Sequence, residues 1–125
     1  MSLGTLEIPA TEDILRVVCG LFFLPHLALK FVFLNDTAAF FRRAGFKHPI
    51  PTIGVDACVE AVSAAMLIGK LYVPFAACVA AAHLLVAAGA VWIANGHTWR
   101  WNRGGPEYCL FWAIMCLVVA KSYWP

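Results

Sequence analysis

The sequence predicts an all-α integral membrane protein folded as a four-helix bundle. Of its 125 residues, 62% are hydrophobic, compared with roughly 45–50% in soluble domains, and the mean hydropathy is +0.80. Only 13% of the residues are charged, and four stretches are apolar over the roughly 20 residues that a membrane-spanning helix needs. The length is that of one domain, which we place over residues 1–125.

The four expected spans are residues 14–34, 52–70, 71–94 and 107–124. The first is too long, and too rich in charged and ring-bearing side chains, for the short apolar centre of a cleavable signal peptide. Almost no loop separates the second span from the third, which predicts a tight antiparallel hairpin with Gly69 as the helix terminator.

The two longer connections have amphipathic character. "FFRRAGFKH" (residues 40–48) interleaves phenylalanine with arginine and lysine, which predicts an interfacial amphipathic segment between the first two spans. We expect "KHPIP" to stop that segment, because proline disfavours helix at the residue before it. The last connection, residues 95–107, carries Trp99 and Trp101, which suit the headgroup level.

The distribution of charge bears on orientation and partners. Basic residues concentrate in these two connections, so the positive-inside rule predicts that both lie in the cytoplasm and both termini outside. With a net charge of +2 there is no basic face large enough for nucleic acid, and we expect the lipid bilayer as the surrounding medium instead.

Ionisable residues near the centres of the spans are the strongest functional signal. With a rise of about 1.5 Å per residue, His26, Glu60 and His83 fall at a common depth, and Lys30 and Asp56 lie within two turns of it. Charges at the bilayer centre are costly and usually functional, so we expect these groups to face inward. His83 is then a partner for Glu60 or His26, and Lys30 for Asp56 or Glu60.

The spacing supports a shared face, because His26 and Lys30, like Asp56 and Glu60, are four residues apart. Two interpretations remain open: these groups handle protons for a bound ligand, or they are structural pairs that fix helix register. Arg16 and Glu107 are also expected to face inward. Arg16 could instead extend to the headgroups, and Glu107 could complement the positive helix N-terminus.

The five cysteines lie within the spans and form no CxxC motif, so we interpret them as packing residues. The pattern gives no metal site. Two midplane histidines could ligate a haem axially, but only "AAAH" (residues 80–83) offers the small-residue clearance that a haem needs. A haem is therefore the less favoured cofactor.

Five pieces of sequence, in order, resemble the DoxX family. They are "ILRVVCGLFFLPHLALK", "FFRRAGFKHPIP", "VEAVSAAMLIG", "AAAH" and "GGPEYCL". One departure is Pro25, directly before His26, which we expect to kink the first span. The resemblance implies a small four-helix protein of the bacterial inner membrane, with relatives among membrane subunits linked to quinone reduction.

The resemblance leaves two functional hypotheses. In the first, the chain is a quinone-linked oxidoreductase subunit that needs a protein partner carrying a redox centre. Glu60 and His83 are then the catalytic groups, and His26, Lys30, Asp56, Arg16 and Glu107 bind the quinone. In the second, the chain is a non-catalytic membrane anchor or assembly partner, with "FFRRAGFKH" as its docking surface.

Overall fold

The computed structural model describes residues 10–125, and these residues form helices and connections with no strand. The all-α prediction is therefore confirmed. The elements are α1 (Thr11–Leu21), α2 (Phe23–Val32), α3 (Leu34–Arg43), α4 (Pro49–Gly69), α5 (Val73–Ala94), the short 3₁₀ helix η1 (Trp101–Arg103) and α6 (Glu107–Ser122).

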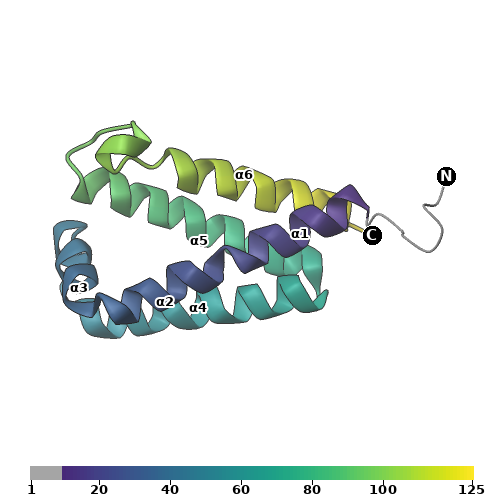
Figure 1. The fold of residues 1–125 in the computed structure, drawn as a ribbon, viewed down its shortest axis with the longest axis horizontal. Coiled ribbons are helices and arrows are strands. Elements are labelled where there is room, and N and C mark those ends of the chain that lie inside the picture. Colours follow the sequence, from purple (N-terminus) through teal and green to yellow (C-terminus); the bar gives the residue numbers. More distant parts are fainter. Residues whose placement is uncertain (1–9) are drawn as a thin grey trace.

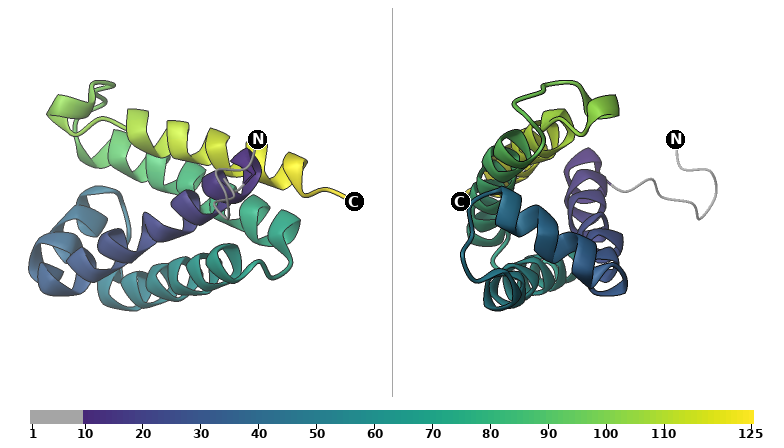
Figure 2. Two further views of the ribbon diagram at one scale, coloured as in Figure 1. Left: turned by 45° about the vertical axis from the view of Figure 1, so that its right-hand side comes forward. Right: turned by 90° about the vertical axis from the view of Figure 1, so that its left-hand side faces the viewer.

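The helices form two pairs that open like a wedge (Figure 1). α5 packs along α6, and α2 packs along α4. The pairs meet where α1 begins and the chain ends, and they diverge toward α3, which closes the open side (Figure 2). The α1–α2 stretch crosses between them, so α1 contacts α6 and α4 at one end while α2 contacts α4 at the other.

Three helical stretches are long and apolar enough to cross a membrane in the part of the chain that the structure describes. They are Thr11–Val32, which joins α1 and α2, Pro49–Gly69 and Val73–Ala94. α6 has 16 residues, or about 24 Å at the helical rise, so it is shorter than the roughly 30 Å hydrocarbon core.

The first span is interrupted near the position of the expected kink. The helix breaks at Phe22, between α1 and α2, shortly before Pro25. Proline has no N–H to donate to the carbonyl of Leu21 four residues earlier, and its ring crowds that carbonyl. The expected end of this span at Leu34 is wrong, because Phe33 leaves the helical region and α3 begins at Leu34 (φ −113° and ψ 51° at Phe33).

The prolines of "KHPIP" begin a helix rather than stop one. α3 already ends at Arg43, before Gly45, whose φ of 105° belongs to the left-handed region. α4 starts at Pro49, ahead of the expected residue 52. Proline is favoured in the first turn of a helix, where its missing N–H has no intrahelical partner in any case.

The hairpin between α4 and α5 forms as expected, but Gly69 does not terminate the helix through a left-handed conformation. Gly69 is the last helical residue, and Lys70 adopts the left-handed cap with φ 58°. Tyr72 follows with φ 46°, and α5 then begins at Val73. Two non-glycine residues therefore make the reversal.

The main core lies where the helix pairs meet. Its central residues on α5 are alanines, and small side chains let membrane helices approach closely. Phe23, Leu67 and Leu84 are fully buried among them. The alanines and cysteine that α5 and α6 contribute to this core are Ala76, Ala77, Ala80, Ala81, Ala113, Cys116 and Ala120.

Candidate functional site

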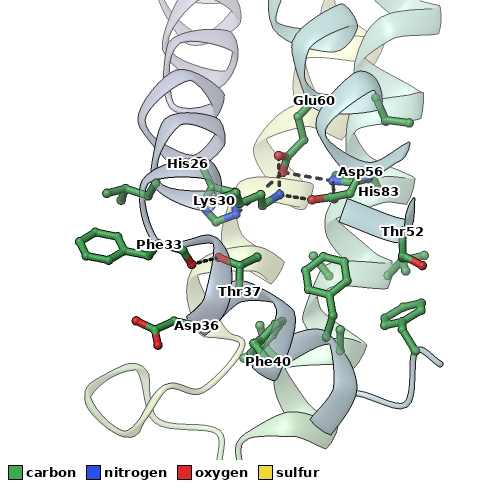
Figure 3. Close-up of a pocket in the computed structure, with 18 of the residues that line it drawn as sticks. His26, Lys30, Phe33, Asp36, Thr37, Phe40, Thr52, Asp56, Glu60 and His83 are labelled. Carbon is green, nitrogen blue, oxygen red and sulfur yellow. Dashed lines mark hydrogen bonds and ion pairs between the residues drawn. The ribbon is translucent and has the colours of Figure 1, made fainter. Parts of the chain in front are cut away.

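Five ionisable side chains from three helices meet inside the wedge (Figure 3). α2 contributes His26 and Lys30, α4 contributes Asp56 and Glu60, and α5 contributes His83. We call these five residues the polar cluster. Each helix places its members there because residues one turn apart lie on the same face. Residues that the sequence places at a similar depth on three separate helices are therefore in contact in the structure.

Lys30 is the cationic centre of the polar cluster. Its ammonium group donates hydrogen bonds to Asp56 Oδ2 and to Glu60 Oε1. The prediction that Lys30 pairs with Asp56 or Glu60 is confirmed, and it pairs with both. Only 12% of the Lys30 side chain is exposed, so water screens these pairs much less than it screens surface pairs.

His83 bridges the same two carboxylates from the opposite side. Its Nε2 lies 2.8 Å from Asp56 Oδ1 and 3.2 Å from Glu60 Oε2. The expected pairing with Glu60 is confirmed, although Asp56 is the nearer partner. His26 Nε2 lies 3.9 Å from Glu60 Oε2, which is too long for a hydrogen bond. His26 therefore retains hydrogen-bonding capacity for another group.

The charges of the polar cluster nearly balance. Two carboxylates and one ammonium give a net charge of −1, and a proton on His83 brings the sum to zero. Glu60 is 1% exposed, and an uncompensated charge at such a site would be strongly unfavourable. The cluster can thus gain or lose one proton on His83 while every remaining charge keeps an opposite partner.

The polar cluster forms the inner end of a pocket of about 570 Å³. Apolar side chains such as Leu29, Phe33 and Val86 form its walls, and Asp36 and Thr37 of α3 lie at its outer end. Figure 3 shows the cluster above Thr37 and Asp36 in this pocket. A mostly apolar cavity with a few convergent polar groups is the usual form of a small-molecule site.

The structure does not bring Arg16 into the polar cluster. Arg16 is buried, as predicted, but it lies ten residues before His26, or about 15 Å along the helix. Its guanidinium donates to the carbonyl oxygens of Leu67 and, at 3.0 Å, Ile68, near the end of α4. A further bond of 3.1 Å reaches the hydroxyl of Tyr123. Arg16 therefore joins α1, α4 and the end of α6.

Glu107 also lies outside the polar cluster and does not line its pocket. It opens α6, as predicted, and its Oε2 accepts a hydrogen bond of 2.9 Å from the backbone N–H of Trp101. This contact fixes the η1 turn against the start of α6. Neither Arg16 nor Glu107 is positioned to bind a ligand that sits against Lys30 and Glu60.

Two aromatic residues of α6 border the site and were missed in the sequence. Tyr108 lines the pocket, and the Trp112 ring stands perpendicular to the His26 ring with centroids 5.7 Å apart. The indole N–H of Trp112 donates to the carbonyl of Cys19 at 3.2 Å. Their spacing of four residues directly after Glu107, on a single helical face, is the signal that could have revealed them.

Asp56, Glu60 and His83 are also residue types that bind metal ions, with candidate ligand atoms all within 4.8 Å of one another. The Lys30 ammonium already contacts both carboxylates. A divalent cation held by His83 and the two carboxylates would lie beside this ammonium group and be repelled by it. The donor set thus fits an internal ion pair better than a metal centre.

In comparisons with known proteins, the chain matches the model of one family. The DoxX family model matches residues 12–95, which is more than half of the chain and includes the whole polar cluster. The match ends before α6 and so does not include the "GGPEYCL" piece. No curated protein and no solved structure matches the chain. The chain belongs to the DoxX family, and its apolar helices make it an integral membrane protein.

Proposed function

We propose that this protein is the membrane subunit of a redox system and binds a quinone head group against the polar cluster. The observation that supports this most directly is the apolar pocket of about 570 Å³ that ends at Lys30, Glu60 and His83. Its volume lies within the roughly 300–1,000 Å³ of small-molecule sites.

The donors at the inner end suit a quinone. A quinone head group is a flat, uncharged ring whose two carbonyl oxygens accept hydrogen bonds. The Lys30 ammonium has three N–H donors, of which two are engaged by Asp56 and Glu60. The third donor of Lys30, the ring N–H of His26 and the hydroxyl of Tyr108 border the pocket. Apolar walls accommodate the ring faces.

Reduction of a quinone to a quinol takes two electrons and two protons. His83 can deliver the first proton through Glu60, because both carboxylates share its Nε2, and a proton from the aqueous side then restores it. The restored His83 supplies the second proton by the same route. Asp36 and Thr37 at the outer end of the pocket provide polar groups toward that side. The sequence contains no motif for an electron carrier, so the electrons are assigned to a redox centre on a partner protein.

The proposal also includes a placement in the membrane. α6 is the fourth span, completing a four-helix bundle, and α3 is the interfacial amphipathic segment. The chain resides in the bacterial cytoplasmic membrane with both long connections in the cytoplasm. The end of the molecule that carries α3 and η1 is basic and would dock the redox partner. Its basic residues are Arg42, Arg43, Lys47, Arg100 and Arg103.

One observation favours the alternative function, a non-catalytic anchor or assembly partner. Lys30, Asp56 and Glu60 already satisfy one another through direct bonds, so they can fix the register of α2 on α4 with no ligand present. In that case the basic end alone carries the function, and the pocket need hold no quinone.

Quinone content and the effect of one variant decide between the two functions. Protein purified in lipid nanodiscs is extracted with solvent, and the quinone per protein is measured beside the absorption spectrum. Glu60→Gln keeps size and hydrogen bonding but removes the titratable proton. We expect about one quinone per protein, and a loss of quinone-linked turnover of about tenfold or more in membranes. Cys58→Ala, an exposed position on the same helix, is the matched control.

Two results would overturn the redox function. The first is purified protein that carries no quinone and binds none when quinone is added. The second is a Glu60→Gln protein with unchanged turnover, because the proton-handling role rests on that carboxylate.

A further inference from the structure

A second hollow runs between α1–α2 and α6 and holds about 470 Å³. We call it the α1–α6 groove. It exists because α1 contacts α6 near the chain termini while α2 turns away toward α4 (Figure 1). Its apolar lining includes Leu15, Val18, Phe22, Leu29, Phe111 and Met115.

The α1–α6 groove adjoins the pocket at the polar cluster. His26, Leu29 and Tyr108 line both hollows. The groove therefore lies beside the proposed head-group site, and a ligand seated against Lys30 and His26 has this groove as its nearest apolar hollow outside the pocket.

The α1–α6 groove also opens toward the membrane. Phe22 is 61% exposed and Phe111 is 65% exposed, and these large apolar side chains lie on its rim. Its wall runs from Leu15 to Leu29, or about 21 Å at 1.5 Å per residue. The shape is that of a long, narrow, apolar channel at the lipid-facing surface, which matches an extended hydrocarbon chain.

We propose that the α1–α6 groove binds the isoprenoid tail of the quinone whose head group lies at the polar cluster. This inference rests on the proposed function. It assigns the tail to the face between α1 and α6, and it makes His26 and Tyr108 the junction between head and tail. The bilayer already solvates a free tail, so the groove contributes through close packing and through orientation of the head group.

Binding of two quinones that share one head group tests the inference. One has no tail and the other has two isoprene units, and each is titrated into protein in nanodiscs of one lipid composition. Quenching of tryptophan fluorescence reports binding, because Trp112 lines the groove. For each protein variant we take the ratio of the two dissociation constants and compare this ratio between variants. The tailed quinone partitions into the lipid to the same extent in every sample, so partitioning does not affect the comparison.

Val18→Phe fills the groove, because Val18 lines it. Val62→Phe is the matched control, because Val62 is 57% exposed on α4 and lines neither hollow. We expect Val18→Phe to weaken binding of the tailed quinone by about tenfold, as overpacking of a fitted site does. Binding of the tail-less quinone should stay within about twofold in all three proteins.

The outcomes separate the two proposals. An unchanged ratio in Val18→Phe overturns the tail site and leaves the head-group site standing; the groove then holds a lipid acyl chain. Equal weakening of both quinones also overturns the tail site, since the substitution then acts on the head. Failure of both quinones to bind the wild-type protein overturns the proposed function itself.

A crosslinking experiment covers the case in which Val18→Phe does not fold. A quinone with a photoreactive group at the end of its tail is bound to the wild-type protein, and the labelled peptides are identified by mass spectrometry. Labelling of α1 or α6 near Leu15 and Met115 supports the proposal. Labelling confined to α4 or α5 overturns it.

Discussion

Replacement of Lys30 by methionine should destabilise the protein strongly, and removal of the Glu60 charge in the same chain should reverse part of the loss. Lys30→Met keeps an unbranched side chain of similar length but removes the cation between two carboxylates. Asp56 and Glu60 then face each other with His83 as their shared basic partner. One of the two negative charges is left without compensation.

The magnitude follows from burial. Glu60 is 1% exposed as a side chain and Asp56 is 15% exposed, so neither charge is well solvated. Removal of one partner from a buried ion pair costs about 3–5 kcal/mol. We expect Lys30→Met to lower the free energy of unfolding by that amount.

Glu60→Gln should cost much less, about 1 kcal/mol, because Lys30 and His83 both keep Asp56 as a partner. In the double variant, Asp56 and a protonated His83 form a neutral pair. The double variant should therefore be more stable than the sum of the single effects predicts, by about 2 kcal/mol, which lies within the range for residues in direct contact.

The assay is reversible unfolding in mixed micelles with increasing denaturing detergent, followed by helical circular dichroism. Lys121→Met, an exposed lysine at the end of α6, is the control for loss of a lysine charge and should change stability by less than about 0.5 kcal/mol. Additive effects of Lys30→Met and Glu60→Gln would refute the charge-balance reasoning. A loss of unfolding free energy below about 1 kcal/mol in Lys30→Met would refute it as well, because removal of one partner from a buried ion pair destabilises a protein by more than that.

Three further predictions concern the ends of the bundle. Arg16→Met should lower stability by about 2–3 kcal/mol, since two carbonyl oxygens near the end of α4 lose a charged donor; thermal unfolding measures this, and a neutral result would contradict it. Gly20→Ala should cost about 1–3 kcal/mol in the same assay, because an added Cβ would lie 2.9 Å from Ile68 Cγ1. Gly54→Ala, which meets nothing within 4 Å, should be harmless, and equal effects at both glycines would exclude a steric cause. Glu107→Gln should change stability by less than about 1 kcal/mol and leave quinone binding unchanged in the titration above, whereas lost binding would return Glu107 to the site.

The polar cluster could be predicted from the sequence because two simple quantities determine it. The helical rise places His26, Glu60 and His83 at one depth, and the cost of a charge in lipid turns each of them inward. Neither step requires knowledge of helix packing. The same arithmetic separates Arg16 from the cluster. Ten residues along a helix are about 15 Å, which is half of the roughly 30 Å hydrocarbon core. The expectation that Arg16 binds the ligand is therefore inconsistent with its depth along the helix.

The helix ends were harder to predict, because hydropathy does not show where a helix stops inside an apolar stretch. Phe33 interrupts a run of apolar residues with no proline or glycine beside it, and Lys70 takes a left-handed conformation that its neighbour Gly69 would adopt more readily. Pro49 can end one helix or begin the next, and the local sequence favours neither. In each case tertiary contacts choose between local alternatives that the sequence leaves nearly equal.

The wedge shape, and with it both hollows, follows from the sizes of the side chains between the helices. At the narrow end, α1 meets α4 at Gly20, where Leu67 Cβ and the Ala64 carbonyl lie within 3.3 Å of an ideal Cβ position, and α5 and α6 contribute alanines to the core. At the wide end, the side chains of Asp56 and Glu60 on α4 reach His83 on α5 and span the space between the two pairs, and the phenylalanines around α3 pack at the open side. Because small residues draw the helices together at one end and long polar ones hold them apart at the other, the polar cluster lies beside open volume and is not closed over. Substitutions that fill the wide end should therefore affect ligand binding before stability, and those that enlarge residues at the narrow end should do the reverse.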